Sequence, residues 1–188
     1  KVYLRKRLKF ALSISFTTII WVGVTQADKL VLSGILSLSD YGHYSLAVLL
    51  GSAVLVVTSP LGTILMPRLV KLNETKSRLE YEQLYRKSSS IVAAIGTVVA
   101  STLFFYSNQI ILMWTGDTAI SQKASEIASV YALGNLFLCV SSFGYYLQYS
   151  KGNLKYHVKG NTLFLLTYVP VLVVVSYQYG DKSHCTHQ

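Results

Sequence analysis

The chain has 188 residues, of which 52% are hydrophobic and only 13% are charged, and its formal net charge is +9. A soluble globular domain carries about 25% charged residues, so this composition argues against a soluble protein. The positive charge alone would suit nucleic acid or acidic lipid, but the placement of the basic residues favours a membrane topology and no nucleic-acid partner.

Five apolar stretches predict five transmembrane helices, because a spanning helix needs about 20 residues and satisfies its own backbone groups. They lie at about 10–36, 44–66, 88–106, 127–149 and 162–179. The predicted fold class is therefore an all-α, polytopic membrane helix bundle. A cleaved signal is the alternative for the first stretch, since Thr25-Gln26-Ala27 resembles a cleavage site. Its length and the four later spans favour a transmembrane helix.

Basic residues are concentrated before the first span, between the second and third, and between the fourth and fifth. All of the 17 lysines and arginines lie there except Lys29, Lys123 and Lys182. Because basic residues in short loops stay in the cytoplasm, we predict a cytoplasmic N-terminus and a C-terminus on the other side. The segment 68–87 mixes charges with leucines, which predicts a helix lying at the membrane interface.

The first span carries a polar stripe at helical spacing. Its members are Ser15, Thr18, Thr25, Lys29 and Ser33. The hydroxyls could bond back to the preceding turn, but we favour a buried or water-lined face. Asp28 and Lys29 are costly, since a charge at the centre of a span costs roughly 2.5–3.5 kcal/mol. They point about 100° apart, so each needs its own partner, unless Lys29 snorkels and Asp28 is solvated at the outer surface.

In the second span Pro60 follows Thr58 and Ser59. Proline removes a backbone hydrogen bond and clashes with the preceding turn, while neighbouring hydroxyls can repair the loss. We therefore predict a kink and a candidate hinge at Pro60.

The fourth span carries a second polar stripe, with Gln148 one position away from it. Its members are Tyr131, Asn135, Ser142, Tyr145 and Tyr149. Tyrosines at the two ends of a span also form interface belts. The deeper positions of Asn135 and Tyr145 favour a polar cavity lining, in which a tyrosine ring can stack on a sugar and its hydroxyl can bond it.

No catalytic grouping is evident: no nucleophile with a base on one face, no paired carboxylates and no glycine-rich phosphate loop. We predict no enzyme activity and no cofactor. The polar tail 181–188 contains His184, Cys185 and His187. These are three candidate ligands without an evident scaffold, whereas structural zinc takes four, so we predict no metal site.

Several motifs resemble bacterial polysaccharide flippases. The stretches 26–30 (QADKL) and 37–45 (SLSDYGHYS) are similar to the opening of the second half of those proteins. Ser59-Pro60-Leu61 with Met66-Pro67-Arg68-Leu69 is similar to the next helix and its cytoplasmic exit. The motifs at 114–117, 132–135, 148 and 152–153 extend the resemblance over about 9–180. It points to the multidrug/oligosaccharidyl-lipid/polysaccharide superfamily, and to its O-antigen flippases most.

The resemblance implies two lobes of about six helices each, of which residues 1–180 form part of the second. We expect a truncated form, in which a truncation or a frameshift would explain the tail 181–188. The implied function is translocation of an undecaprenyl-diphosphate-linked oligosaccharide across the bacterial inner membrane, for O-antigen or capsule assembly. The expected partners are the lipid bilayer, that substrate and other polysaccharide assembly proteins.

The resemblance also suggests roles for individual residues. Lys29 and Arg68 are candidate cations for the diphosphate, and Asp28 is a candidate charge partner or ion-coupling residue. The candidate sugar contacts are Asn135, Tyr145 and Gln148. The alternatives are a small-molecule or drug exporter of the same superfamily, a non-functional remnant, or a membrane-embedded polysaccharide polymerase. The short outer loops argue against the polymerase.

Overall fold

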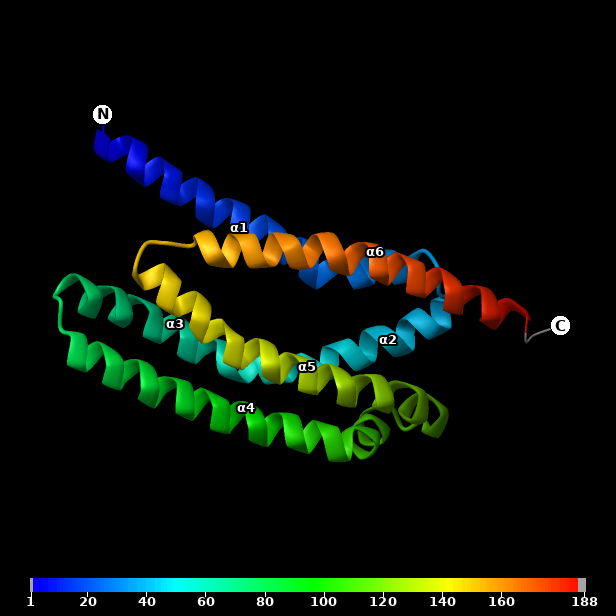
Figure 1. The fold of residues 1–188 in the computed structure, drawn as a ribbon. Coiled ribbons are helices and arrows are strands. Elements are labelled where there is room, and N and C mark those ends of the chain that lie inside the picture. The colour runs from blue at the N-terminus through cyan, green and yellow to red at the C-terminus, as the bar shows by residue number, and fades with distance from the viewer. Residues whose placement is uncertain (1, 186–188) are drawn as a thin grey trace. The chain divides into compact units, whose positions relative to one another are not determined.

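A computed structural model describes the backbone of residues 2–185 and the side chains of residues 8, 11, 12 and 14–176. These residues form six helices and no strand (Figure 1). The helices are α1 (Val2–Ser33), α2 (Leu38–Gly51), α3 (Ala53–Glu74), α4 (Arg78–Thr115), α5 (Thr118–Ser150) and α6 (Lys155–Cys185).

Four helical stretches among the described residues could cross a membrane, judged by their length and composition. They are Leu38–Glu74, Arg78–Thr115, Thr118–Ser150 and Lys155–Ser176. The first of them consists of α2 and α3 together. The predicted fold class, an all-α polytopic membrane helix bundle, is confirmed.

The first predicted span, 10–36, lies mostly in α1, which is not among those four stretches. The described part of α1 contains the polar residues Gln26, Asp28 and Lys29. However, α1 packs against α6, which contains a candidate span. A Cβ placed on Gly23 would lie 3.6 Å from the Leu165 side chain of α6. A fifth span formed by α1 stays a prediction.

The chain divides into two compact units. Lys1–Tyr41 and Gly152–Gln188 form one, which contains the packed pair α1 and α6. Gly42–Lys151 forms the other, in which α3, α4 and α5 pack on one another.

Small residues let α4 and α5 approach closely in the second unit. Ala100, Ala124, Ala128 and Ala132 have no exposed surface. Close approach of backbones through small residues is typical of membrane helix pairs, as are hydrogen bonds between their hydroxyls. The Ser107 hydroxyl supplies these bonds, donating to the Ser125 carbonyl at 3.1 Å and lying 2.9 Å from the Ser129 hydroxyl.

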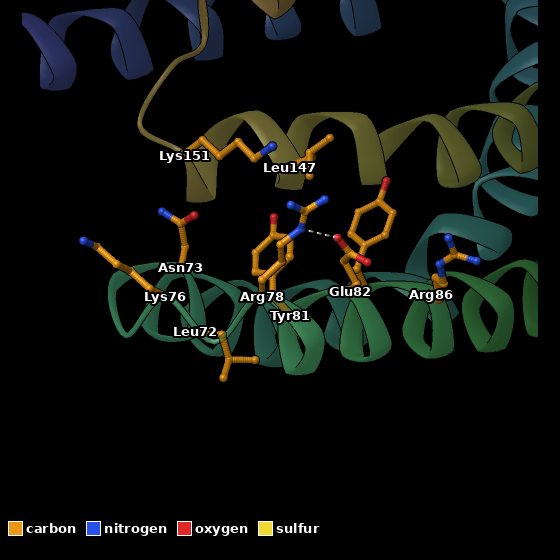
Figure 2. A pocket seen from close by; sticks show the side chains of 10 residues that line it. Leu72, Asn73, Lys76, Arg78, Tyr81, Glu82, Arg86, Leu147 and Lys151 are labelled. Atoms are coloured by element: carbon orange, nitrogen blue, oxygen red, sulfur yellow. Dashed lines mark hydrogen bonds and ion pairs between the residues drawn. The ribbon is translucent and has the colours of Figure 1, made fainter.

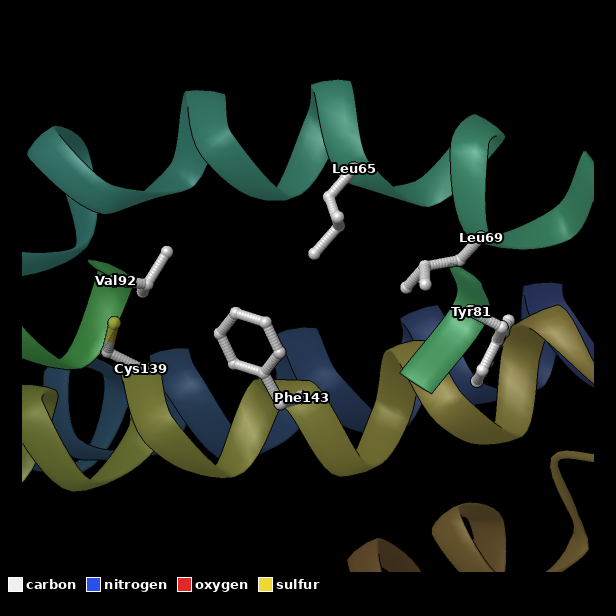
Figure 3. Packing of buried hydrophobic residues seen from close by; sticks show 6 residues of the cluster. All are labelled: Leu65, Leu69, Tyr81, Val92, Cys139 and Phe143. Atoms are coloured by element: carbon white, nitrogen blue, oxygen red, sulfur yellow. The ribbon is translucent and has the colours of Figure 1, made fainter. Parts of the chain in front are cut away.

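Larger side chains fill the space where α3, α4 and α5 meet (Figure 3). The buried residues of this cluster are Leu65, Leu69, Tyr81, Val92, Cys139 and Phe143. By contrast, many large apolar residues of the same unit are exposed, among them Phe105, Val130 and Phe137. Extensive exposed apolar surface suits contact with lipid hydrocarbon.

The predicted interfacial helix over 68–87 is wrong. α3 continues to Glu74, and α4 begins at Arg78 after a short turn. The turn closes α3 with two hydrogen bonds, from Ser77 N to the Leu72 carbonyl at 3.2 Å and from Lys76 N to the Asn73 carbonyl at 3.4 Å. This pair of bonds is the Schellman motif that ends many helices. The mixture of leucines and charges therefore belongs to the ends of two long helices.

The candidate span Leu38–Glu74 is interrupted at Ser52, which the sequence did not predict. In a continuous helix Leu55 N would donate to the Gly51 carbonyl, but it donates to the Ser52 carbonyl at 2.9 Å. The Gly51 carbonyl accepts a hydrogen bond from Asn135 Nδ2 of α5 at 3.0 Å instead. The Ser52 hydroxyl donates to the Leu49 carbonyl at 2.7 Å. Side chains thus satisfy two of the carbonyls at the interruption, those of Leu49 and Gly51.

At Pro60 the helix continues, since α3 runs through both Pro60 and Pro67. Pro60 has no N–H for the Val56 carbonyl, and the Ser59 hydroxyl donates to that carbonyl at 3.3 Å. The expected repair by a neighbouring hydroxyl is confirmed. The hinge role of Pro60 stays a prediction.

Gly51 allows the end of α2 to lie against α5. A Cβ at this position would meet Tyr131 Cβ at 2.9 Å, Ala132 N at 3.2 Å and the Ala128 carbonyl oxygen at 3.3 Å. Backbone atoms cannot move aside cheaply, so Gly51→Ala should destabilise the fold by roughly 1–3 kcal/mol. Thermal unfolding in detergent measures this effect.

The matched control for that substitution is Gly134→Ala on α5, where a Cβ would meet nothing within 4 Å. Alanine is favoured over glycine in a helix by roughly 1 kcal/mol, so this variant should be as stable as the parent or more stable. Equal losses in the two variants would contradict the close packing at Gly51.

The turns between helices test the topology. Reporter fusions after Lys76 and Lys155 should give a cytoplasmic signal, and a fusion after Asp117 should give an extracytoplasmic one, because the basic loops stay inside. Fusions after Lys9 and Ser39 test the first span in the same way. A cytoplasmic signal after Asp117 would rule out alternate crossing by α4 and α5.

Candidate functional site

Asp28 is the one carboxylate among the buried polar residues described, with 6% of its surface exposed. Its Oδ1 accepts a hydrogen bond from the backbone N of Lys29 at 2.9 Å. The carboxylate also lies near Tyr168 of α6. α1 therefore turns a carboxylate toward α6, within the first unit.

The Lys29 side chain is half-buried, and its Nζ donates to Gln26 Oε1 at 3.1 Å. The two adjacent charges thus have different partners, as their angular separation on the helix predicts. Because the amide is neutral, this hydrogen bond does not compensate the charge of the ammonium group.

The hydroxyls of the α1 stripe do not form a buried face. Thr18 donates to the Ile14 carbonyl at 3.0 Å, and Thr25 donates to the Trp21 carbonyl at 2.9 Å. Among the side chains of α1 that the structure describes, those of Thr17, Ile20, Ala27 and Asp28 are buried. Thr18 and Thr25 therefore bond back to the preceding turn, and the stripe is not buried in this structure. A water-lined face stays a prediction.

On α5 the candidate sugar contacts have different surroundings. Asn135 is buried with its amide nitrogen bonded to the Gly51 carbonyl, so a structural role accounts for its place in the span. Tyr145 and Gln148 are half-buried. The Tyr145 ring lies 5.8 Å from the Tyr149 ring and 5.9 Å from the Tyr146 ring, between centroids. This aromatic row offers ring faces and hydroxyls on one part of α5.

Arg68 lies exposed near the end of α3 and lines two grooves between α3 and α4. One groove has a volume of about 680 Å³ and also contains Lys71, Lys87 and Glu80. The other is smaller, about 120 Å³, and is lined mainly by apolar side chains. Arg68 thus stands at the charged end of the helix pair, where a cation near the mouth of a path was predicted.

A further groove of about 680 Å³ lies between the α3–α4 turn and the end of α5. We call it the basic groove; its charged side chains are Lys76, Arg78, Glu82, Arg86 and Lys151. Figure 2 shows Arg78 and Lys151 lying between these elements.

One ion pair is formed inside the basic groove. Arg78 Nε donates to Glu82 Oε1 at 2.9 Å. Both residues belong to the charged beginning of α4, which lies outside the apolar part of that helix. The hydrogen bond and the positive charge of Arg78 hold the pKa of the Glu82 carboxyl below its usual range. The carboxylate thus stays ionised and offsets one of the four cations.

Ser150 fixes the walls of the basic groove. Its carbonyl accepts a hydrogen bond from Asn73 Nδ2 of α3 at 3.0 Å, and its hydroxyl lies 2.7 Å from the Tyr81 hydroxyl of α4. Tyr81 and Ser150 are both buried. The Tyr85 ring also packs edge-on against the Phe143 ring, 5.8 Å between centroids. Buried contacts therefore position the groove, while its charged groups are exposed.

Residues 1–120 match the model of a family described as polysaccharide biosynthesis proteins. The chain belongs to this family. No curated protein and no solved structure is significantly similar to it. The family match and the candidate spans together identify a multi-pass membrane protein of polysaccharide biosynthesis.

The matched segment of this polysaccharide biosynthesis protein runs from α1 through α4 to the start of α5. It includes Asp28, Lys29, Pro60 and Arg68. The remaining candidate residues, Asn135, Tyr145 and Gln148, follow it in the chain. The family therefore covers the candidate charges and the candidate hinge, while the proposed sugar contacts rest on the polar stripe of α5.

The basic groove was not predicted from the sequence. Read along the chain, its lysines and arginines indicate which loops stay in the cytoplasm, but not that the side chains line one groove. A signal for it does exist in the sequence. The five-span topology puts the 66–88 and 149–162 loops on the same side of the membrane, so their basic residues are able to meet.

The structural role of Asn135 predicts a loss of stability on substitution. Asn135→Leu removes the donor to the Gly51 carbonyl, and an interhelical hydrogen bond in a membrane protein contributes about 1 kcal/mol. The control is Ser142→Ala, since the Ser142 hydroxyl donates to the Cys139 carbonyl of its own helix at 2.6 Å. Thermal unfolding in detergent should show the larger loss for Asn135→Leu. Equal stabilities would contradict this role.

Proposed function

We propose that this protein takes part in moving an undecaprenyl-diphosphate-linked oligosaccharide across the bacterial inner membrane, for O-antigen or capsule assembly. The family supports a role in polysaccharide biosynthesis, and the candidate spans support a membrane location. The observation that favours translocation in particular is the buried carboxylate of Asp28, which lies beside Lys29 on α1.

Charged residues inside a membrane protein are expensive, and those that are retained usually mark a path for ions or polar substrates. A hydrogen bond to Gln26 does not neutralise Lys29. A lipid-linked oligosaccharide carries a diphosphate, which requires cations along any path through hydrocarbon. Lys29 is suited to this task, and Asp28 to ion coupling or to pairing with a further cation.

The remaining candidate residues, which lie in the second unit, would also contact the lipid-linked oligosaccharide or assist its movement. Arg68 would meet the diphosphate near the cytoplasmic mouth, where α3 ends in exposed charged residues. Tyr145 and Gln148, both half-buried on α5, would contact sugar. Pro60 would allow α3 to change shape.

In this proposal the protein is not an enzyme and needs no cofactor. Its N-terminus is cytoplasmic and its C-terminus periplasmic, it belongs to a two-lobe flippase architecture, and other polysaccharide assembly proteins act with it. The basic loops on one side of the candidate spans support this orientation.

Substitution of Lys29 tests the proposal in flippase-deficient cells that express the chain or a longer protein that contains it. Lys29→Ala should abolish surface polysaccharide at normal protein levels and cause lipid-linked oligosaccharide to accumulate, because the diphosphate loses its cation. Lys29→Arg should keep part of the activity.

Lys159→Ala serves as the control, since it removes an exposed lysine of α6. This variant should remain active. Full activity of Lys29→Ala would favour snorkelling of Lys29 and remove the basis of the proposal. A change in drug resistance without accumulation of lipid-linked oligosaccharide would identify an exporter instead.

A further inference from the structure

The basic groove is distinct from the residues assigned to transport. We propose that it is a binding site for the phosphate group of a phosphate-bearing lipid. The inference does not depend on the transport proposal, because it rests on charges and contacts at the ends of α3, α4 and α5.

The first argument is charge. Lys76, Arg78, Arg86 and Lys151 face a groove in which Glu82 is the carboxylate, and Glu82 is already bonded to Arg78. The groove therefore has a positive charge in excess. The four cations line this groove, with Arg78 and Lys151 near each other and Lys76 and Arg86 farther along it (Figure 2). Cationic side chains lining a groove can bind a phosphate through charge-assisted hydrogen bonds.

The second argument is the apolar part of the groove. Leu72 and Leu147 contribute to its lining beside the cations. The groove lies at the end of three helices that contribute to candidate membrane spans, where the headgroups of lipids are found. A free phosphate has no apolar part that could contact the two leucines. A lipid offers both parts, with an anionic headgroup for the cations and the beginning of a chain for the leucines.

The third argument is the backbone of Lys76, which has φ 55° in the left-handed region. Glycine is favoured at this position of a Schellman motif. The other left-handed residues in the described part of the chain are Gly116 and Gly152, which both follow helix ends. A lysine costs conformational free energy here, yet Lys76 lines the basic groove. This is the pattern expected of a side chain kept for binding rather than for folding.

The test is lipid binding by the purified 188-residue chain in detergent, measured by native mass spectrometry with phosphatidylglycerol as the probe. Lys76→Gly should lower the affinity on the order of tenfold, which corresponds to the loss of one charge-assisted contact. The same variant should melt at a higher temperature, by about 2–4 °C, since glycine relieves the left-handed backbone.

Lys151→Gln removes a second cation of the groove without changing the α3–α4 turn, and should weaken phosphatidylglycerol binding by a similar factor. The control is Lys87→Gln, which removes a lysine that lines the Arg68 groove instead. It should bind like the parent chain. Equal losses in all three variants would overturn the proposal, because they would show a general effect of net charge.

Two further probes separate the parts of the ligand. Diacylglycerol, which lacks the phosphate, should bind at least about tenfold more weakly than phosphatidylglycerol. Pyrophosphate should compete with phosphatidylglycerol only weakly. Equal binding of diacylglycerol would overturn the role of the cations. Pyrophosphate affinity equal to that of the lipid would overturn the role of the leucines and identify a soluble phosphate as the ligand.

Discussion

A peptide group that lies in hydrocarbon has to find its hydrogen bond within the protein, because lipid offers neither donor nor acceptor. Long helices meet this requirement residue by residue, and an interruption leaves carbonyls to be satisfied. At Ser52 this need is met from another helix, by the amide of Asn135 bonding to the Gly51 carbonyl. The absence of a side chain on Gly51 is what allows α5 to come near enough. The interruption and the packing of α5 therefore depend on each other.

The placement of α5 has effects farther along the same helix. Once α5 is held at Gly51, its other end meets α3 and α4, where Ser150 bonds to Asn73 and Tyr81. Between these two points lies the cluster around Leu69 and Phe143. The three helices are thus joined by hydrogen bonds at two levels with a close-packed apolar region between them. This arrangement gives the basic groove fixed walls.

The long helices could be predicted from the sequence because a helix that crosses a bilayer needs an apolar stretch of about 20 residues. The boundary between α4 and α5 was predicted less closely, since the predicted spans ended at 106 and began at 127. In the structure Gly116 is left-handed and ends α4, and the Asp117 carboxylate caps α5. The interruption at Ser52 was not predicted, because glycine and serine are common in membrane helices and the partner, Asn135, lies far along the chain. Pro60 gave a stronger local signal, yet Ser59 restores the missing bond and α3 continues.

The candidate site was predictable to a smaller degree, for a related reason. The cost of Asp28 and Lys29 can be read from the residue type alone, and the structure gives each a separate partner. The partner of a hydroxyl or an amide cannot be read in this way. Thr18 and Thr25 bond to their own helix, whereas Asn135 bonds to another. Polar stripes therefore predict which residues need partners but not whether those partners are substrate, backbone or solvent.

The length of α4 links the basic groove to the thickness of the bilayer. This helix has 38 residues, about 57 Å at 1.5 Å per residue, whereas the hydrocarbon layer is about 30 Å thick. Its charged first ten residues alone extend about 15 Å. A thinner or thicker bilayer is accommodated by a change in helix tilt. Because the groove is built on the projecting end of α4, such a change alters its depth among the headgroups. Lipid composition would thus change the position of the groove in the bilayer, apart from the proposed binding of a lipid in it.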